Sequence, residues 1–318
     1  MSNMKSASIN RRNTECWKAD VQRSVLFYNN WFLDFAPATY VAARKSAISK
    51  VEAAFSMTNF FGEVTPAMLE EHPELIAILR MSTTPPLARD RLSGLADVSK
   101  QLVKSLEEGR RCGDEAEFCR ILQIITRLLD REILPWLGRG DSPVGSEAAV
   151  ASAIIGDRVC GSLADPIIRN EQERRQLRSI ESFLCERGYK LVQSKDIPLC
   201  TAMAPGTFAY HLNIPVKIAR GKKVNIPVDV AIMRKGAKSG DIPLFIECKS
   251  AGDFTNTNKR RKEEAVKIEQ LRKTYGNDAG LVLFLCGYFD SGYLGYEAAE
   301  GIDWVWEHRI GDLEKAGV

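Results

Sequence analysis

Apolar residues recur every three or four positions through the first 137 residues, which is the spacing of helices with one buried face. The run from Trp17 to Phe61 predicts two helices that meet at Ala36-Pro37, because the residue before a proline is disfavoured in the α conformation. Thr65-Pro66 has the residue types of an N-cap and a first helical position. Further helices are predicted over residues 75–79, 98–106 and 115–137.

A short polar segment, GRGDSPVGSE at 138–147, follows this helical half of the chain. Its three glycines and one proline are typical of a linker between domains. We therefore expect a helical N-terminal domain over residues 1–140 and a second domain over residues 148–318.

After residue 148 the pattern becomes mixed. Helices are predicted over residues 148–159 and about 168–187, with a turn at 164–166 between them and an end at Gly188. Apolar runs then predict strands, followed by one basic helix and a last buried strand. The strands are expected near residues 189–193, 207–216, 226–233, 242–250 and 279–289. This order predicts an α/β (α+β) fold, in which a helical N-terminal region precedes a central mixed β-sheet flanked by helices.

The strands expected at 226–233 and 242–250 carry charged residues inside apolar runs. The loop KGAKSGD between them has the glycines and aspartate of a hairpin connection. Glu247 and Lys249 are two positions apart and therefore project from one face, whereas Cys248 points the other way. If the two strands pair, Asp229 reaches the same face. Burial of such a cluster is costly unless the charges are paired or coordinate a metal.

Two carboxylates and one ammonium at a common point suit metal-assisted hydrolysis of a phosphodiester. Mg²⁺ prefers one or two carboxylates with phosphate oxygens and waters, so Asp229 and Glu247 are the predicted metal ligands. Lys249 would orient the attacking water or stabilise developing negative charge. The spacing resembles the PD-(D/E)XK nuclease superfamily, although Val228 separates Pro227 from Asp229. The motif alone is weak, and the alternative is a surface ion pair between Glu247 and Lys249.

The helix expected over residues 168–187 offers a third acid. At about 100° per residue, Glu173, Leu177, Ile180 and Leu184 share one stripe, and Glu171 lies near the opposite face. An acid on a buried stripe either pairs with an arginine or the helix dipole, or it serves the metal site. Because the helix before the motif strands often supplies a glutamate in the superfamily that this spacing resembles, we expect Glu173 to be catalytic.

Two stretches are predicted to contact DNA. The first is a polar loop that leads into a basic helix start, where cations oppose the helix dipole and favour a bound phosphate. Its alternative is a solvated helix face. The second is the arginine-bearing segment at 80–91, whose alternative is an interhelix connection with arginines paired to nearby acids. The predicted contacts are Asp253, Thr255, Asn256, Thr257, Asn258, Lys259, Arg260, Arg261, Lys262, Arg80, Arg89 and Arg91.

Composition limits the compartment and the chemistry. A net charge of +3 permits a nucleic-acid partner without requiring one. Eight cysteines without a C-x-x-C pair exclude the common zinc spacings, and three scattered histidines disfavour a histidine-dependent hydrolase. The sequence has neither a signal-peptide pattern nor an apolar run long enough to span a membrane, so a cytoplasmic protein with free thiols is expected.

Longer strings within the chain are more specific. TTPPLARDRLSGLA, NIPVDVAIM and IECKSAGDFTNTNKRRKEEA, among others between about Trp31 and Ile310, resemble the XamI-type restriction endonucleases. The resemblance implies a type II restriction endonuclease, a Mg²⁺-dependent homodimer that cuts double-stranded DNA at a short palindromic site. It implies a partner DNA methyltransferase, metal binding by Asp229 and Glu247, and water positioning by Lys249. Ends with 5′-phosphate are a superfamily expectation, and the N-terminal domain would serve DNA recognition, dimerisation or both.

Three alternatives remain at this point. A repair or recombination nuclease with the same core would cut branched rather than linear DNA. A DNA-binding module with a decayed site would bind without cutting, although the intact motif argues against it. An interaction protein without a nucleic-acid role would show no salt-dependent affinity for DNA.

Overall fold

The computed structural model describes residues 8–218, 222–255, 257–277 and 279–318, without the side chains of residues 257–261. The chain forms two compact units. We call Phe35–Ile168 the helical unit, and Arg169–Val318 together with the described residues up to Asp34 the sheet unit. This division differs from the one expected at residues 138–147. That segment lies within the helical unit, where Arg139 forms an ion pair with Glu147 at 2.8 Å.

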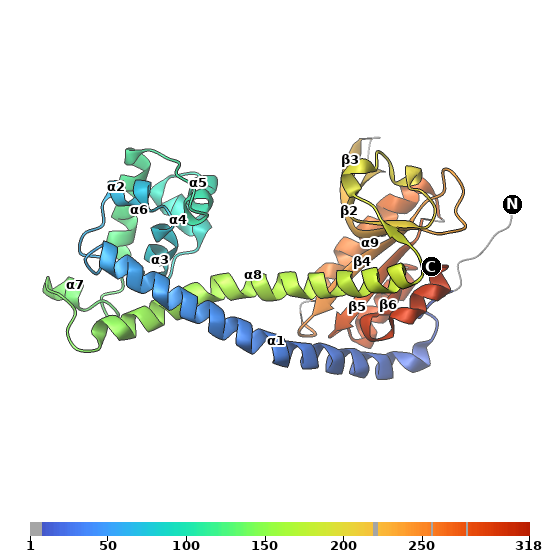
Figure 1. Cartoon of the computed structure of the whole chain (residues 1–318), viewed down its shortest axis with the longest axis horizontal. Coiled ribbons are helices and arrows are strands. Elements are labelled where there is room, and N and C mark those ends of the chain that lie inside the picture. The colour runs from blue at the N-terminus through green and yellow to red at the C-terminus, as the bar shows by residue number, and fades with distance from the viewer. Residues whose placement is uncertain (1–7, 219–221, 256, 278) are drawn as a thin grey trace. The chain divides into compact units, whose positions relative to one another are not determined.

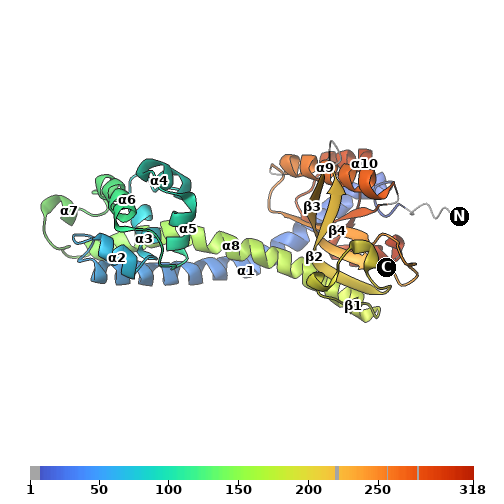
Figure 2. The same cartoon turned by 90° about the horizontal axis from the view of Figure 1, so that it is seen from above.

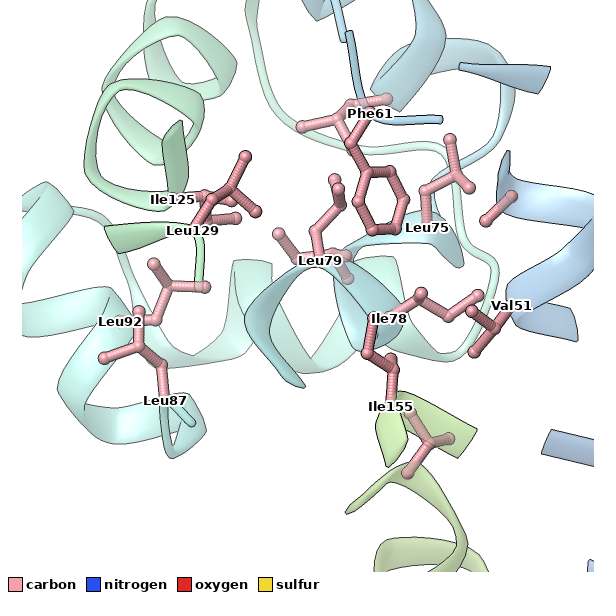
Figure 3. Close-up of a cluster of buried hydrophobic side chains, with 14 of the residues drawn as sticks. Val51, Phe61, Leu75, Ile78, Leu79, Leu87, Leu92, Ile125, Leu129 and Ile155 are labelled. Atoms are coloured by element: carbon pink, nitrogen blue, oxygen red, sulfur yellow. The ribbon is translucent and has the colours of Figure 1, made fainter. Parts of the chain in front are cut away.

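The helical unit has a continuous apolar core, part of which is drawn in Figure 3. Leu79 and Ile125 are fully or almost fully buried there and come from different helices. Thr65 is the N-cap of its helix and Pro66 the first helical residue, as predicted. The helices of this unit are parts of α1 (Thr14–Met57) and α8 (Glu147–Glu186), with α2 (Pro66–Glu71), α3 (Leu75–Met81), α4 (Arg89–Ala96), α5 (Lys100–Glu107), α6 (Glu115–Leu128) and α7 (Trp136–Arg139).

Two predicted helix breaks are absent from these described segments. Pro37 lies inside α1 and Pro166 inside α8, so the expected boundary at 36–37 and the expected turn at 164–166 were wrong. An interior proline removes one backbone hydrogen bond and costs about 3 kcal/mol. The buried Ala36 and Ala164 lie beside these prolines, and further buried residues of both helices follow or precede them. Packing of the buried residues on either side of each proline therefore outweighs the local penalty.

The helix predicted over residues 115–137 is shorter than expected. It ends at Leu128, because Leu129 adopts an extended conformation and forms an isolated β-bridge with Thr83. Asp130 then donates its backbone N–H to the carbonyl of Ser82. Tertiary pairing thus replaces the last turns of a helix that the apolar spacing alone favours.

The sheet unit is built on one six-stranded mixed sheet in the order β1-β2-β3-β4-β5-β6 (Figure 1). β2, β3 and β4 are antiparallel neighbours, and the pairs β1/β2, β4/β5 and β5/β6 are parallel. The predicted hairpin and the predicted α/β fold are therefore confirmed. The strands are β1 (Lys190–Leu191), β2 (Thr207–Lys217), β3 (Lys223–Met233), β4 (Leu244–Ala251), β5 (Leu281–Gly287) and β6 (Asp303–Trp306).

Helices cover both faces of the sheet. α9 (Thr257–Tyr275) and α10 (Ser291–Ala299) lie together on one face (Figure 2), where Leu271 and Leu294 pack against the strands. The C-terminal part of α8, with Ile180 and Leu184, packs on the other face. β5 is buried along its whole length, as its continuous apolar run predicts. Within the described residues, no helix combines the length and hydropathy that crossing a membrane requires.

Candidate active site

The motif residues of β4 share one face of the sheet. Phe245 and Ala251 belong to the core beneath α9 and α10, and Glu247 and Lys249 lie between them at the same alternation. The Lys249 Nζ atom is 3.3 Å from Oε1 of Glu247, while Cys248 packs on the opposite face. The predicted distribution of these three residues over the two faces of β4 is therefore confirmed. On the α8 side, the buried Gln176 donates its Nε2 to the carbonyls of Lys249 and Phe284, which fixes the end of β4.

Asp229 lies beside this pair on the neighbouring strand. The backbone N–H of Cys248 donates to Oδ2 of Asp229 at 2.8 Å, which ties the carboxylate to the motif segment of β4. Burial raises the pKa of Asp229 above its ordinary value, and the nearby charge of Glu247 raises it further. The two carboxyl groups are thus close enough to repel each other when both are ionised.

In both β2 and β3, the alternation of side chains between the two faces of the sheet is interrupted next to Asp229. Ala209 packs on the α9 side, whereas beyond His211 it is the even-numbered Leu212 and Ile214 that pack there. In β3, Ala231 and Val228 pack on this side although they are three apart. His211 has a φ of 48°, a left-handed conformation in which histidine is enriched among non-glycine residues. The kink brings His211 and Asp229 to the same edge of the site.

The outer edge of the site contains Glu173, which helical phase assigned to a buried stripe but which is about half exposed in the structure. One ligand atom from each of Glu173, His211 and Asp229 lies within 4.8 Å of the other two. Nε2 of His211 is 3.7 Å from Oε1 of Glu173, and both side chains are about half exposed. Glu171 instead forms an ion pair with Arg178. Sequence reasoning missed His211, which carries no motif and is recognised only once β2 is paired with β3.

The inner edge of the site is formed by α9, which the sequence analysis did not include among the catalytic candidates. Lys267 Nζ donates to Oε2 of Glu247 at 2.7 Å and to the carbonyl of Pro227 at 2.8 Å. Glu264, only 2% exposed, places Oε1 3.8 Å from Nζ of Lys249. The sequence signal that could have identified them is the i,i+3 spacing of Glu264 and Lys267, which places an acid and a base on one face of the helix.

Lys249 is held as an ammonium by this surrounding. Burial acts to lower its pKa, but the carboxylates of Glu247, Glu264 and Asp229 outweigh burial and raise the pKa above the ordinary value. A buried, charged lysine beside these carboxylates can orient a water or a phosphate oxygen. The residues also fit a divalent cation, because the carboxyl groups of Asp229, Glu247 and Glu264 outnumber the ammonium groups of Lys249 and Lys267 that face them. Carboxylate oxygens are the ligands that hard divalent cations prefer.

Comparison with known proteins identifies the family to which this chain belongs. The sequence model of the XamI restriction endonuclease family matches residues 59–306. The chain belongs to the XamI restriction endonuclease family. It is 50% identical over 316 residues to the type II restriction enzyme SalI of Streptomyces albus G, covering 97% of this chain and 99% of that protein. A crystal structure of protein VC1899 from Vibrio cholerae aligns with a TM-score of 0.29 and 11% identity, over 79% of this chain and 57% of that one.

Family membership makes the protein a site-specific deoxyribonuclease, as the resemblance of its sequence strings implied. It also implies a divalent metal cofactor. A chain without enzymatic activity is thereby disfavoured, since in this restriction endonuclease Lys249 hydrogen-bonds to Glu247, and Asp229 accepts from the backbone N–H of Cys248 between them.

The loop expected to contact DNA follows directly after β4 of this endonuclease. Asp253 and Thr255 are exposed, and the Asp253 carboxylate accepts from the backbone N–H of Thr255 at 2.9 Å. Lys262 is exposed on α9. Asn256 lies outside the described residues, as do the side chains of Thr257, Asn258, Lys259, Arg260 and Arg261.

The arginines at 80–91 of the endonuclease differ in their surroundings. Arg80 is 5% exposed, pairs with Glu107 and donates to the carbonyl of Leu87 at 2.9 Å. A DNA phosphate cannot reach a guanidinium in that position, so the contact predicted for Arg80 was wrong, because the guanidinium stabilises the core instead. Arg89 is half exposed and pairs with the same glutamate, and Arg91 is exposed.

Proposed function

We propose that this restriction endonuclease hydrolyses both strands of DNA at a short palindromic site, with Mg²⁺ as cofactor and 5′-phosphate ends as products. The observation that supports the proposal best is the joint placement of Asp229, Glu247 and Lys249 on adjacent strands. Hydrolysis of a phosphodiester needs a cation to neutralise charge and an oriented water. These three side chains provide the carboxylates and the ammonium for those two tasks.

Each residue has a distinct part in the proposed reaction. Asp229 and Glu247 would hold the metal, which supplies charge neutralisation and a bound water of lowered pKa. Lys249 would donate a hydrogen bond to the attacking water or to a non-bridging phosphate oxygen. Glu173, on the outer edge, would orient water or extend the set of metal ligands from α8. Its exposure leaves it accessible to a water or a cation that approaches from solvent.

DNA contacts are proposed for the segment that follows β4 in the sheet unit and, separately, for the exposed arginines of the helical unit. Asp253, Thr255 and Lys262 have exposed polar or charged groups, as do Arg89 and Arg91. The four cations at positions 259–262 would add electrostatic attraction to the phosphate backbone. The proposed assembly is a homodimer, since two identical sites related by a two-fold axis match the two strands of a palindrome.

The proposed setting is a cytoplasmic restriction-modification pair. A nuclease that cuts its site in any DNA needs a partner methyltransferase that modifies the same site in the host DNA. Methylation of the cut site by such an enzyme should therefore block cleavage.

The test is incubation of the purified protein with a long linear duplex of known sequence, in Mg²⁺ and in EDTA. Discrete Mg²⁺-dependent fragments with a common palindrome at their sequenced ends, ligatable without added kinase, would support the proposal. Light scattering during gel filtration should give twice the mass of one chain. Cutting confined to branched DNA, or no cutting in Mg²⁺, would contradict it.

A further inference from the structure

Helix α9 carries an acid and a base that face β4, and each lies opposite a strand residue of the opposite charge. Glu264 of the helix faces Lys249 of the strand, and Lys267 of the helix faces Glu247 of the strand. Glu264, Lys267, Ile268 and Leu271 share the helical spacing that turns one face of α9 toward the sheet. Of these four residues, Glu264 and Lys267 are charged, and they lie opposite the motif residues Glu247 and Lys249.

Both carboxylate oxygens of Glu247 have an ammonium partner in this arrangement. Oε1 is 3.3 Å from Nζ of Lys249, and Oε2 is 2.7 Å from Nζ of Lys267. A cation bound by Glu247 would compete with both lysines for these oxygens. Lys249 therefore needs a second anionic partner that is not shared with a metal, since an ammonium on a four-carbon stem is otherwise mobile.

Glu264 has the rigidity that such a partner requires. Tyr293 of α10 donates its hydroxyl to Oε2 of Glu264 at 2.7 Å, and Glu297 of the same helix is buried near the Glu264 carboxyl group. The side chains of Glu264, Tyr293 and Glu297 are 2%, 2% and 0% exposed, so close packing restricts all three to one arrangement. Oε1 of Glu264 is left facing Lys249 at 3.8 Å.

We propose that Glu264 is a positioning residue of the endonuclease: it holds the Lys249 ammonium at the reaction centre while Glu247 is engaged by the cation. The inference rests on the proposed role of Lys249 in cleavage. Glu264 touches neither DNA nor the attacking water, and its whole effect passes through Lys249.

The test is Glu264→Gln, which keeps the volume and an oxygen for Tyr293 but removes the negative charge. Single-turnover cleavage at saturating DNA and Mg²⁺ should slow about 10- to 100-fold, the range expected for a catalytic group that is misplaced by about 1 Å. The Kd for DNA in Ca²⁺ should remain within about 2-fold of wild type, because the loss concerns the reaction step. Glu269→Gln, an exposed position of the same helix, is the matched control and should cut at the wild-type rate.

A double-mutant cycle separates positioning from a general loss of structure. In a Lys249→Ala background, measured with excess enzyme over long incubations, Glu264→Gln should cause no further loss of rate. A further loss as large as in wild type would overturn the inference. So would wild-type cleavage by Glu264→Gln itself.

A second variant covers the case in which Glu264→Gln folds poorly. Tyr293→Phe keeps the buried ring and removes the hydroxyl that orients Glu264, and should slow cleavage several-fold with unchanged DNA affinity. A wild-type rate for Tyr293→Phe would overturn the inference. Failure of the proposed function has a different signature, because then the wild-type protein itself would not cut linear DNA in Mg²⁺.

Discussion

Two buried glutamates of this protein each lie between two cations, but their surroundings differ. In the helical unit, the Glu107 side chain is 6% exposed and pairs with Arg80 and Arg89. In the sheet unit, the Glu247 side chain is 9% exposed and pairs with Lys249 and Lys267. Burial and ion pairing alone therefore do not distinguish a structural cluster from a catalytic one.

The difference lies in the balance of charge. Around Glu107, two guanidinium groups face one carboxylate, and Arg80 is further satisfied by the carbonyl of Leu87. Around Glu247, Asp229 and Glu264 add carboxyl groups, and burial raises the pKa of both. The first cluster is satisfied by protein groups, whereas the second has an excess of acid that a bound cation would relieve. Removal of single groups should therefore affect stability in one cluster and cleavage in the other.

The largest effect on activity is expected from Lys249→Ala. Loss of the ammonium should decrease the single-turnover cleavage rate on the order of 10³-fold, to a residual rate measurable only with excess enzyme, because it removes the group aimed at developing charge. DNA binding in Ca²⁺ should be largely retained. Single-turnover cleavage and a Ca²⁺ binding isotherm measure the two quantities. Cleavage by the variant at the wild-type rate would remove Lys249 from the mechanism.

The largest effect on stability is expected from Glu107→Ala. It leaves two guanidinium groups, one of them buried, without their carboxylate, and should lower the free energy of unfolding by about 3–5 kcal/mol. Glu108→Ala is the matched control: Glu108 is exposed and pairs with Lys104 and Arg110, so its loss should cost less than about 1 kcal/mol. Urea denaturation measures the free energy of unfolding of both variants. Equal decreases for Glu107→Ala and Glu108→Ala would show that the Glu107 cluster is not a structural one.

Asp229→Asn should have the opposite effect on stability while it prevents cleavage. An acid whose folded-state pKa is raised binds protons more tightly in the folded protein than in the unfolded chain. Without metal, the wild-type protein should therefore lose stability relative to the variant as pH rises from 3.8, the ordinary value for Asp, through the raised pKa.

Thermal unfolding in EDTA across this pH range measures the effect of Asp229. The variant should have the higher Tm on the alkaline side of the window, and added Mg²⁺ should stabilise the wild type more than the variant. A wild type that gains stability relative to Asp229→Asn as pH rises would show that Asp229 is fully compensated by protein groups.

A smaller effect is expected at the outer edge of the site. Glu173→Ala should slow cleavage by about 10-fold, as is usual for a group that supports a metal site from its periphery. Glu171→Ala should leave the rate unchanged, since Glu171 pairs with Arg178 and lies away from Asp229. Glu171 and Glu173 lie on the same helix and carry the same charge. Slower cleavage by Glu171→Ala than by Glu173→Ala would show that the helical phase assigned to α8 does not hold in the DNA complex.

Local spacing was sufficient to predict part of this site. Strand alternation placed Glu247 and Lys249 on one face, and helical phase directed Glu173 toward the site, although it assigned this half-exposed residue to a buried stripe. Both inferences follow from the period of a single element. The continuous paths of α1 and α8 through Pro37 and Pro166 could not be predicted in this way, because tertiary packing overrides the local cost of proline.

The residues that sequence reasoning missed depend on which elements become neighbours. Glu264 is known to face Lys249 only once α9 is packed on the sheet, and Tyr293 only once α10 lies beside α9. Arg80 was misassigned for the same reason, since its partner Glu107 lies 27 positions away in the sequence. His211 depends on the pairing of β2 with β3 and on a left-handed backbone that alternation does not anticipate.

The smallest effect, and the most selective one, is expected at His211. An imidazole nitrogen favours a transition metal over Mg²⁺, so a site that includes His211 should bind Mn²⁺ more tightly than a site of carboxylates alone. His211→Asn keeps a residue type that tolerates the left-handed conformation and should raise the half-saturating Mn²⁺ concentration several-fold while changing that of Mg²⁺ little. His72→Asn, in the helical unit, is the control. Titration of both metals against DNA cleavage, and of Mn²⁺ by electron paramagnetic resonance, measures the shift. Equal changes for the two metals would place His211 outside the metal's ligands and leave it as a residue that shapes the kink beside Asp229.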